Sequence, residues 1–358
     1  MEVVAVGVGG AGGRIVDELH RNNVSRPLSF LSASHVFDTD TASLNALDRV
    51  REDARHSFGT FEFSASGTDG DREGVAEALA EQVTEMRREI DDSITTNVTG
   101  IVLAAGLGGG VGAGATPILA REIGEIYDRP VYCISVLPTA DSETAAENAA
   151  YALDALDGVV DCQIAFDNER WVGEGEAIAG KIPDLNRELA DRVGSLLVAG
   201  EVDPAGSIGE SVLDETDVTA TLDAGGLATI GYASSPVAQF RDVEDSLVGR
   251  IRGKLLESAS DIERYEAVTT TLNWAVRGQL TLEIDLDAAG SAMVLFSGPP
   301  DWLDRQAIAD GRDWVAGLTD SAQRRSGDAP VPGSESLSVL VVFAGVESAP
   351  RIEELQWY

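Results

Sequence analysis

The sequence predicts an α/β protein with a parallel-sheet domain, a long central helix and a second, smaller α/β domain. Three observations support this expectation. Short apolar, β-branched runs alternate with amphipathic helical segments over roughly the first half of the chain, which is typical of a parallel sheet covered on both faces. Two of these runs end in glycine-rich turns that open helices. Beyond about residue 225 strict alternation sets in at Leu280, Leu282, Ile284 and Leu286, which predicts a strand with one solvated face.

The elements expected in the N-terminal part follow one another as strand, helix and strand. Each strand is a run of residues suited to burial, and each helix has apolar residues along one side. The expected order is strand 2–8, helix 14–23, strand 28–37, a short helix capped by Asp40 or Thr41, loop 58–72, helix 74–90, strand 101–105, glycine loop 106–114, a helix to about 127, strand 131–136, helix 143–156 and strand 161–166.

The C-terminal part begins after the long amphipathic helix expected from Pro183 to about Ala199. Its apolar positions recur at the helical period, so it should pack along one stripe. After the alternating segment we expect strands at 292–296 and 337–343, a helix at 302–318 and an exposed loop at 326–333.

The charge balance is strongly acidic, with 61 acidic against 26 basic residues and a formal net charge of −35. Only Lys181 and Lys254 are lysine. Such a surface repels phosphate backbones, so we expect no nucleic-acid partner. Molar salt would screen its self-repulsion to within about 3 Å, which predicts a salt-loving host.

The remaining composition points to a cytoplasmic protein. The sequence contains no apolar run of the roughly 18 residues that span a bilayer, and its start, MEVVAVGVGG, lacks a basic leader. Cys133 and Cys162 are expected to be buried free thiols. His20, His35 and His56 are expected to lie too far apart for a metal site, and no metal ligands are assigned to the protein.

The first glycine turn reads Gly7-Val8-Gly9-Gly10-Ala11-Gly12 and satisfies GxGxxG between a strand and a helix. Without side chains the backbone can approach a phosphate, and the helix N-terminus directs amide donors at it. The pattern alone also fits a tight turn that binds nothing. It fits a dinucleotide site loosely, because Asp38 follows Gly12 by 26 residues instead of about 20.

The second glycine turn, Ala105 to Gly114, again follows a buried strand and opens a helix. Two such turns on neighbouring strands can hold a chain of phosphates from both sides, a need that a nicotinamide enzyme does not have. No GxxxxGK[ST] motif occurs, since Gly180-Lys181 is followed by Ile182. Backbone amides, helix dipoles and a divalent cation, Mg²⁺, must therefore hold the anion.

At these residues the chain resembles the tubulin/FtsZ superfamily, whose phosphate loop reads GGGTGTG or similar and stands here as Gly108 to Gly114. The AAGLGGG run, Phe166 to Trp171 and Ser348 to Gln356 resemble the archaeal CetZ branch, and the resemblance covers nearly the whole chain. It implies a tubulin/FtsZ-like fold and a GTP-hydrolysing cytoskeletal protein that polymerises head to tail. It also implies domains at 1–182 for GTP, 183–200 for the central helix, 201–225 for a catalytic acidic loop and its helix, and 226–358 for the C-terminal α/β domain.

The resemblance further implies a set of GTP or GDP contacts. Asn168 and Asn186 would bind the guanine edge, and Glu143, with Asp141 as the alternative, the ribose. Thr68 to Asp71 match the loop that senses the γ-phosphate loosely. The phosphate contacts with their neighbours are Gly9, Gly10, Ala11, Gly12, Arg14, Asp38, Gly106, Gly108, Gly109, Gly110, Val111 and Gly112.

The catalytic residues implied by the resemblance are Asp217 first and Asp214 second, three positions apart in Gly209 to Val218. They would complete hydrolysis in trans by orienting water at the next subunit's nucleotide. By spacing alone, such a pair is usually a solvated helix face. Val111 replaces the loop threonine, so we expect slow turnover.

Two other functions stay open beside this one: a structural or regulatory nucleotide-binding protein with negligible hydrolysis, and a nicotinamide-dependent oxidoreductase. The expected partners are other copies of the chain and a guanine nucleotide, with membrane adaptors of unknown identity left open. No long tail with an adaptor motif follows the last strand, so we expect a role in cell shape before one in division.

Overall fold

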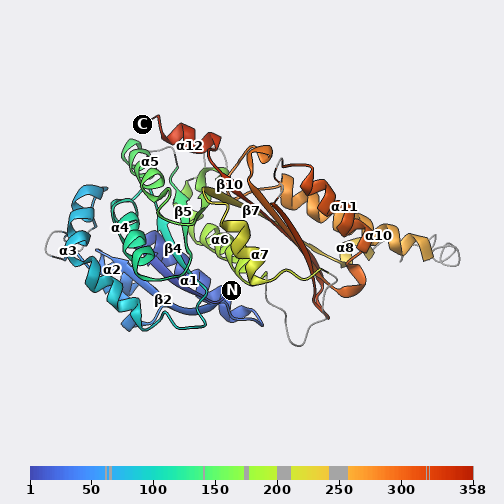
Figure 1. Cartoon of the computed structure of the whole chain (residues 1–358), viewed down its shortest axis with the longest axis horizontal. Helices are drawn as coiled ribbons and strands as arrows, with labels where there is room; N and C mark the ends of the chain where they lie inside the picture. The colour runs from blue at the N-terminus through green and yellow to red at the C-terminus, as the bar shows by residue number, and fades with distance from the viewer. Residues whose placement is uncertain are drawn as a thin grey trace.

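The computed structural model describes residues 1–60, 63, 67–139, 142–172, 177–199, 211–241, 257–319, 321 and 323–357. Within this part ten strands form one sheet in the order β3-β2-β1-β4-β5-β6-β7-β10-β8-β9 (Figure 1). The two parts expected from the sequence therefore share a sheet. The strands are β1 (Val3–Val8), β2 (Leu31–Asp38), β3 (Arg55–Ser57), β4 (Gly100–Gly106), β5 (Val131–Leu137), β6 (Cys162–Asp167), β7 (Leu227–Pro236), β8 (Ser291–Gly298), β9 (Gln323–Pro330) and β10 (Ser336–Val346).

The strands from β3 to β7 are all parallel, as the alternation of strands and helices predicts. Beyond β7 the sheet is mixed, with β10 antiparallel to both of its neighbours and β9 parallel to β8. The parallel strands bring the carboxyl ends of β1 and β4 side by side, because β1 pairs with β4 on one side and β2 on the other. From β1 the chain adds β2 and β3 on one side of the sheet and then β4, β5 and β6 on the other. Open α/β sheets bind ligands at such a point, where the strand order reverses.

Helices cover both faces of the sheet. On one face α1 and α6 pack together, and α3, α4 and α5 pack in a row on the other. None of the described helices is long and apolar enough to cross a membrane. The helices are α1 (Gly9–Ser25), α2 (Thr41–Asn45), α3 (Arg72–Asp91), α4 (Gly110–Ile126), α5 (Glu143–Leu156), α6 (Ile182–Leu197), α7 (Glu215–Leu222), α8 (Ala238–Arg241), α10 (Glu257–Arg277), α11 (Arg305–Ala316) and α12 (Pro350–Leu355).

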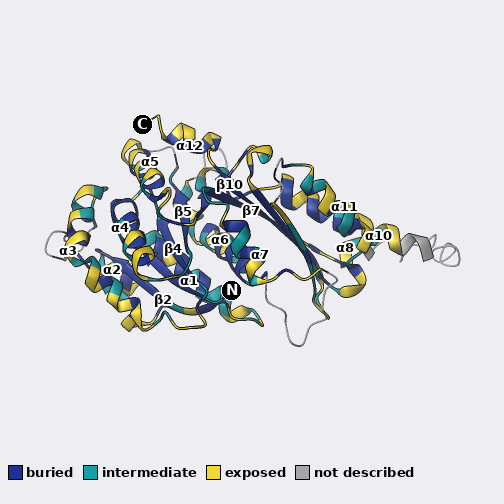
Figure 2. Ribbon diagram, in the orientation of Figure 1, coloured by how far each residue is buried: buried dark blue, intermediate teal, exposed yellow. Residues whose placement is uncertain are grey.

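Several local predictions are confirmed. Asp40 caps α2 by accepting a bond from the Ala42 N–H (2.8 Å). The predicted helix 143–156 matches α5 to the residue, and α6 buries the predicted apolar stripe (Figure 2). β3, β7 and α10 were not predicted, although the buried Ala267, Val268, Leu272, Ala275 and Val276 of α10 do recur at the helical period.

The two glycine turns were predicted as loops, but most of their glycines are helical. Helix α1 starts at Gly9, directly after β1, and α4 starts at Gly110, after a connection of three residues from β4. The glycine content suppressed the helical assignment, since glycine is a poor helix former in isolation.

The alternating segment at Leu280 to Leu286 is not a strand, and its burial alternates only from Leu282 to Asp285. Leu280 and Leu282 are buried, whereas Glu283 between Leu282 and Ile284 is exposed. β6 and β7 pair over only two positions and then diverge. The segment enters the gap between them and bonds to both strands instead of forming a ladder.

Thr281 makes the bonds that close this gap. Its N–H donates to the Ile230 carbonyl (3.1 Å), its carbonyl accepts the Asp167 N–H (2.8 Å), and its hydroxyl accepts the Ile230 N–H (2.9 Å). Thr281 is completely buried. It therefore joins the parallel part of the sheet to the mixed part.

The expected loop at 326–333 is wrong over most of its length, because residues 326–330 belong to β9. β9 is the terminal strand of the described sheet, and Ser211 covers part of its outer edge by accepting the Asp328 N–H (2.8 Å) and donating its hydroxyl to the Ser326 carbonyl (2.9 Å). Arg324 and Arg325 lie on it, as is common for edge strands that must avoid further pairing. A polar edge strand lacks the alternating apolar pattern that reveals a half-buried one.

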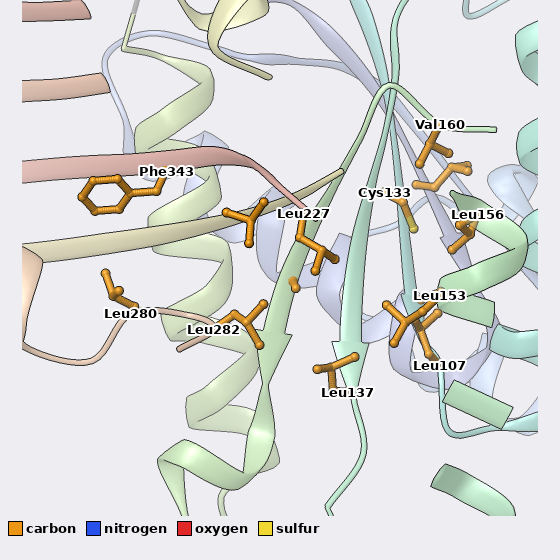
Figure 3. Packing of buried hydrophobic residues seen from close by; sticks show 14 of the residues in the cluster. Leu107, Cys133, Leu137, Leu153, Leu156, Val160, Leu227, Leu280, Leu282 and Phe343 are labelled. Carbon is orange, nitrogen blue, oxygen red and sulfur yellow. The ribbon is translucent and has the colours of Figure 1, made fainter. Parts of the chain in front are cut away.

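The larger core cluster runs through both parts of the molecule. Figure 3 shows Leu107, Cys133 and Leu153 packed between the parallel sheet and α5, and Leu282 and Phe343 continuing the same cluster across the diverging strands. Cys133 and Cys162 are buried free thiols, as predicted.

Replacing Thr281 with valine should destabilise the fold by about 1–3 kcal/mol, because the buried Ile230 N–H loses its acceptor while the side-chain volume is kept. Denaturant unfolding in molar KCl measures the change. Thr281→Ser, which retains the hydroxyl, is the matched control and should lose less. Equal losses in the two variants would contradict a hydrogen-bonding role for the hydroxyl.

Candidate functional site

The N-termini of α1 and α4 meet at the carboxyl ends of β1 and β4. A Cβ built on Gly9, whose φ is +71°, would lie 3.2 Å from the Val111 side chain. Neither helix has a side-chain cap at its start. The first amides of both helices are thus available to one ligand, and both helix dipoles favour an anion there.

Missing side chains allow both helices to pack directly on the strand ends. A Cβ on Gly12 would lie 2.0 Å from the Ala104 carbonyl oxygen, and one on Gly112 would lie 2.1 Å from the Gly106 carbonyl oxygen. Both contacts are with backbone, so no rotamer change could relieve them. The predicted glycine pattern is therefore required for packing, whether or not a ligand is bound.

Gly109 differs from these glycines. It is the N-cap of α4, is exposed, and a Cβ there would approach nothing closer than 3.8 Å. A side chain at this position would enter open space at the N-terminus of α4 without disturbing the fold.

Asp38 and Arg14 lie beside the first turn. A Cβ on Gly10 would be 3.3 Å from Arg14 Nη1, 3.6 Å from Asp38 Oδ2 and 3.2 Å from Ser43 Oγ. Asp38 ends β2 and is buried, and burial raises the pKa of its carboxyl to about 6. Its Oδ1 accepts the Asp40 N–H (3.2 Å).

The described part of the loosely matching loop, Gly67 to Asp71, packs against the start of α4. A Cβ on Gly110 would lie 2.5 Å from Thr68 Oγ1 and 2.9 Å from the Asp71 nitrogen. The loop therefore reaches the second turn, which the weak sequence match alone did not establish.

Asn148, on α5, fixes this arrangement and was missed by the sequence analysis. Its Nδ2 donates to the carbonyl oxygens of Gly70 (3.0 Å) and Gly108 (3.3 Å), and its Oδ1 accepts from Arg72 Nη1 (3.0 Å). Asn148 is buried on the otherwise apolar face of α5. A single polar residue within an apolar stripe was the signal available in the sequence.

Glu143, Asn168 and Asn186 approach the same edge of the sheet from three elements. Glu143 is the first residue of α5, and Ala145 in the same turn lies 3.1 Å from the Cβ position of Gly108. Asn168 directly follows β6. Asp141, the alternative to Glu143, lies outside the described residues.

Asn186 is placed by the packing of α6 along α1. Near their C-terminal ends, a Cβ on Gly194 would lie 2.0 Å from Asn22 Oδ1, and the Met1 amine donates to the Leu197 carbonyl (2.8 Å). Both helices therefore run from the carboxyl edge toward the amino edge. Asn186 precedes Gly194 by about 12 Å of helix, which sets it near the carboxyl edge.

Asp214 and Asp217 form a reciprocal capping box at the start of α7. Asp214 Oδ1 accepts the Asp217 N–H (3.0 Å), and Asp217 Oδ2 accepts the Asp214 N–H (3.0 Å). They do not simply share a solvated helix face, as their spacing alone suggested. Asp217 Oδ1 also lies 3.7 Å from Arg325 Nε on β9. Gly209 and Glu210, earlier in the motif, lie outside the described residues.

The two acids are remote from the glycine turns of their own molecule. The glycine turns lie at the carboxyl ends of β1 and β4, whereas α7 reaches the amino ends of β5 and β6, roughly 20 Å away along strands of seven residues. At the other end of α7, Thr219 and Asp223 line a cavity of about 610 Å³ together with Val131 and Asp161, at the amino ends of β5 and β6. The acids cannot act on a ligand held at the turns of the same chain.

The histidines are closer together than expected. His35 Nδ1 lies 3.1 Å from His56 Nε2, and His35 Nε2 lies 2.8 Å from Ser93 Oγ. The expectation that they are scattered was wrong for this pair, because the parallel pairing of β2 with β3 brings them together. In the described part of the chain, no group of three or more His, Cys, Asp or Glu side chains is arranged to hold a metal ion.

Comparison with known families divides the chain into two adjoining matches. Residues 2–175 match the tubulin/FtsZ family GTPase domain, and residues 175–358 match the C-terminal domain of tubulin-like CetZ. Among related sequences, the tubulin-like protein CetZ5 of Haloferax volcanii is 36% identical, and CetZ1 of the same organism is 33% identical. Each alignment covers 99% of this chain and 91% of the relative.

Solved structures of this group are similar over the whole chain. CetZ1 from Haloferax volcanii, a GDP-bound monomer, has a TM-score of 0.85 at 29% identity, covering 100% of this chain and 98% of that one. CetZ2 from the same organism, a GTPγS-bound protofilament, has a TM-score of 0.85 at 30% identity, covering 100% and 97%. An empty FtsZ dimer of M. jannaschii is similar in fold, with a TM-score of 0.71 at 21% identity, covering 96% and 87%.

The Asp38→Asn variant should be more stable than the parent near neutral pH. The raised pKa means that the folded state binds a proton between about pH 6 and 4 that the unfolded state does not, so the parent gains stability as pH falls through this window. The advantage of the variant is at most about 3 kcal/mol at pH 7.5 and should shrink toward pH 5.

Unfolding of nucleotide-free protein at both pH values tests this. Asp40→Asn is the matched control, because hydrogen bonds from the Ser43 hydroxyl and the Ala42 N–H lower the pKa of Asp40, so its removal should give no gain at pH 7.5. A gain for Asp38→Asn that is independent of pH would contradict the assignment.

Proposed function

Because this chain belongs to the tubulin/FtsZ family and to its CetZ branch, we propose that it binds GTP and GDP and assembles head to tail into filaments. The observation that carries this proposal is the meeting of two uncapped helix N-termini at the ends of β1 and β4. The nucleotide-bound CetZ monomer and the CetZ protofilament among its structural relatives support it.

In this site the phosphates are held by backbone amides. The turn at Gly9 to Gly12 contacts the α- and β-phosphates, and the turn at Gly106 to Gly112 contacts the β- and γ-phosphates. Two helix dipoles and up to eight first-turn amides replace the lysine of a P-loop. Glu143 contacts the ribose, and Asn168 and Asn186 bind the guanine edge through amide groups that offer both donor and acceptor.

A magnesium ion would be coordinated mainly by phosphate oxygens of the nucleotide. Mg²⁺ commonly uses one or two protein oxygens together with phosphate oxygens and water, so the lack of a metal-holding cluster among the described residues fits this mode. Thr68, whose hydroxyl lies beside the start of α4, is the side-chain oxygen best placed to contribute. The ion would neutralise charge on the phosphates.

Hydrolysis is completed by the next subunit in the filament. Its Asp217, assisted by Asp214, orients and polarises the attacking water at the γ-phosphate. These acids lie on a helix that packs at the amino ends of the strands, opposite to the glycine turns of their own chain, which makes action in trans the workable arrangement. Capping the helix uses Asp214 Oδ1 and Asp217 Oδ2, so each carboxylate keeps its second oxygen outside those bonds.

One residue of the second glycine turn favours slow hydrolysis of GTP, or almost no hydrolysis. Val111 stands where the family loop has a threonine, so no hydroxyl is available to the phosphates there. A filament that binds nucleotide and barely hydrolyses it is the second candidate function. The match of residues 2–175 to a GTPase domain gives no support to nicotinamide chemistry. A role in cell shape, a cytoplasmic location and membrane contact through adaptors stay predictions.

Gly109→Asp should abolish GTP and GDP binding while leaving the fold intact. The aspartate places a negative charge at the N-cap of α4, where the phosphates would lie, and it is itself a favourable N-cap residue. Gly109→Ala adds only a methyl group to open space and should bind nucleotide like the parent. Fluorescent-nucleotide titration in molar KCl measures both. Unchanged affinity in Gly109→Asp would contradict the proposed site.

Asp217→Asn should reduce phosphate release by about a hundredfold without weakening nucleotide binding, and the asparagine Oδ1 can still accept the Asp214 N–H of the capping box. Mixing this variant with Gly109→Asp tests action in trans. One subunit then supplies the nucleotide and the other the acid, so the mixture should release phosphate faster than the sum of the two alone. A mixture that only matches that sum would argue against trans hydrolysis.

A further inference from the structure

Arg351 lies near the start of the C-terminal helix α12, and its guanidinium is nearly buried. It contacts two segments at the nucleotide edge, that is, the edge of the sheet at the carboxyl ends of the strands, where the proposed nucleotide site lies. Its Nη2 donates to the Pro138 carbonyl oxygen (2.9 Å) and lies 2.9 Å from Glu169 Oε2. Its Nε is 3.6 Å from Asp167 Oδ1, an ion pair without a hydrogen bond. The side chain is only 7% exposed. One arginine thus joins the segment after β5 to the segment after β6.

The first of these segments leads to the phosphate loop. Pro138 directly follows β5, and its ring packs against the second glycine turn, where a Cβ on Gly108 would lie 2.8 Å from Pro138 Cβ. The bond from Arg351 to the Pro138 carbonyl therefore fixes a residue that packs against the phosphate loop at Gly108.

The second segment, after β6, carries Asn168, which is proposed to bind the guanine base, and it is called the base loop below. Asp167 caps the 3₁₀ turn Asn168–Trp171 by accepting the Glu169 N–H (3.1 Å). Burial raises the pKa of Asp167, and the charge of Arg351 opposes that shift. Arg351 thus stabilises, in its ionised form, the carboxylate that holds Asn168 in place.

Helix α12 also contacts the third nucleotide element, α5. Ala349, Ile352 and Leu355 are buried, and α12 packs on α5, the helix that begins at Glu143. Figure 1 shows α12 and α5 side by side at the top of the molecule, although some 200 residues separate them in sequence. The C-terminal helix therefore contacts a neighbour of each part of the proposed site.

We propose that Arg351 is a positioning residue for the nucleotide, holding the phosphate loop at Gly108 and the base loop at Asn168 in one fixed arrangement. The docking of α12 on α5 then sets how tightly the nucleotide is retained. The planar guanidinium suits this task because it can bond in two directions at once, which an ammonium group does less well. The inference rests on the proposed nucleotide binding.

The test compares Arg351→Met, Arg351→Lys and the double variant Asp167→Asn/Arg351→Met. Arg351→Met should bind GDP about tenfold more weakly, through faster dissociation, with Arg351→Lys in between. The double variant removes the buried unpaired carboxylate, so it should regain stability while its GDP dissociation stays fast. Arg312→Met, which removes an equal charge from an exposed site on α11, should behave like the parent.

Dissociation of a fluorescent GDP by stopped flow and denaturant unfolding, both in molar KCl, give the two readouts. If GDP dissociation returns to the parent rate together with stability in the double variant, Arg351 serves the fold alone and the proposal is overturned. Parent-like dissociation in Arg351→Met overturns it as well. A parent chain that binds no guanine nucleotide would instead overturn the proposed function, and this inference with it.

Discussion

The arrangement depends on how closely helices α1 and α4 approach the strand ends. At Gly12 and Gly112 the space for a side chain is occupied by backbone carbonyl oxygens of the adjacent strand residues. This contact brings two helix N-termini together and leaves their first amides unpaired at one point. An anion is the natural partner for such a point, and no lysine is needed to hold it. In a chain with a net charge of −35, binding a polyphosphate then depends on local dipoles more than on overall charge.

The continuous sheet determines what one molecule can do alone. It is stiff and wide, and it holds the glycine turns and the Asp214–Asp217 capping box at distant positions. Thr281 secures the place where the parallel strands diverge, so the distance between the two sites is built into the core. A reaction that needs both sites must therefore involve two copies. In the proposed function, this geometry links hydrolysis to assembly.

Side chains that are distant in sequence hold the loops at the nucleotide edge in place. Asn148 ties the loop at Gly70 to the turn at Gly108, and Arg351 ties the segments after β5 and β6. Both are buried polar residues that bond groups on two different segments. Their loss would leave buried carbonyl and carboxylate groups unpaired, which makes such networks costly to disturb. The loops of the site are therefore held by a few specific bonds.

The sequence by itself determined the strand and helix order of the N-terminal part apart from β3, located the two glycine turns and narrowed the cap of α2 to Asp40 or Thr41. These depend on local periodicity and on backbone geometry within a few residues. Only the tertiary structure decided that residues 280–286 form no strand, that residues 326–330 do, and that His35 meets His56 and Arg351 meets Pro138. In each of these cases the deciding partner lies on another segment of the chain. Local preference is worth tenths of a kcal/mol per residue, whereas a buried group without its hydrogen-bond partner costs about 1–3 kcal/mol, so distant partners decide wherever the two disagree.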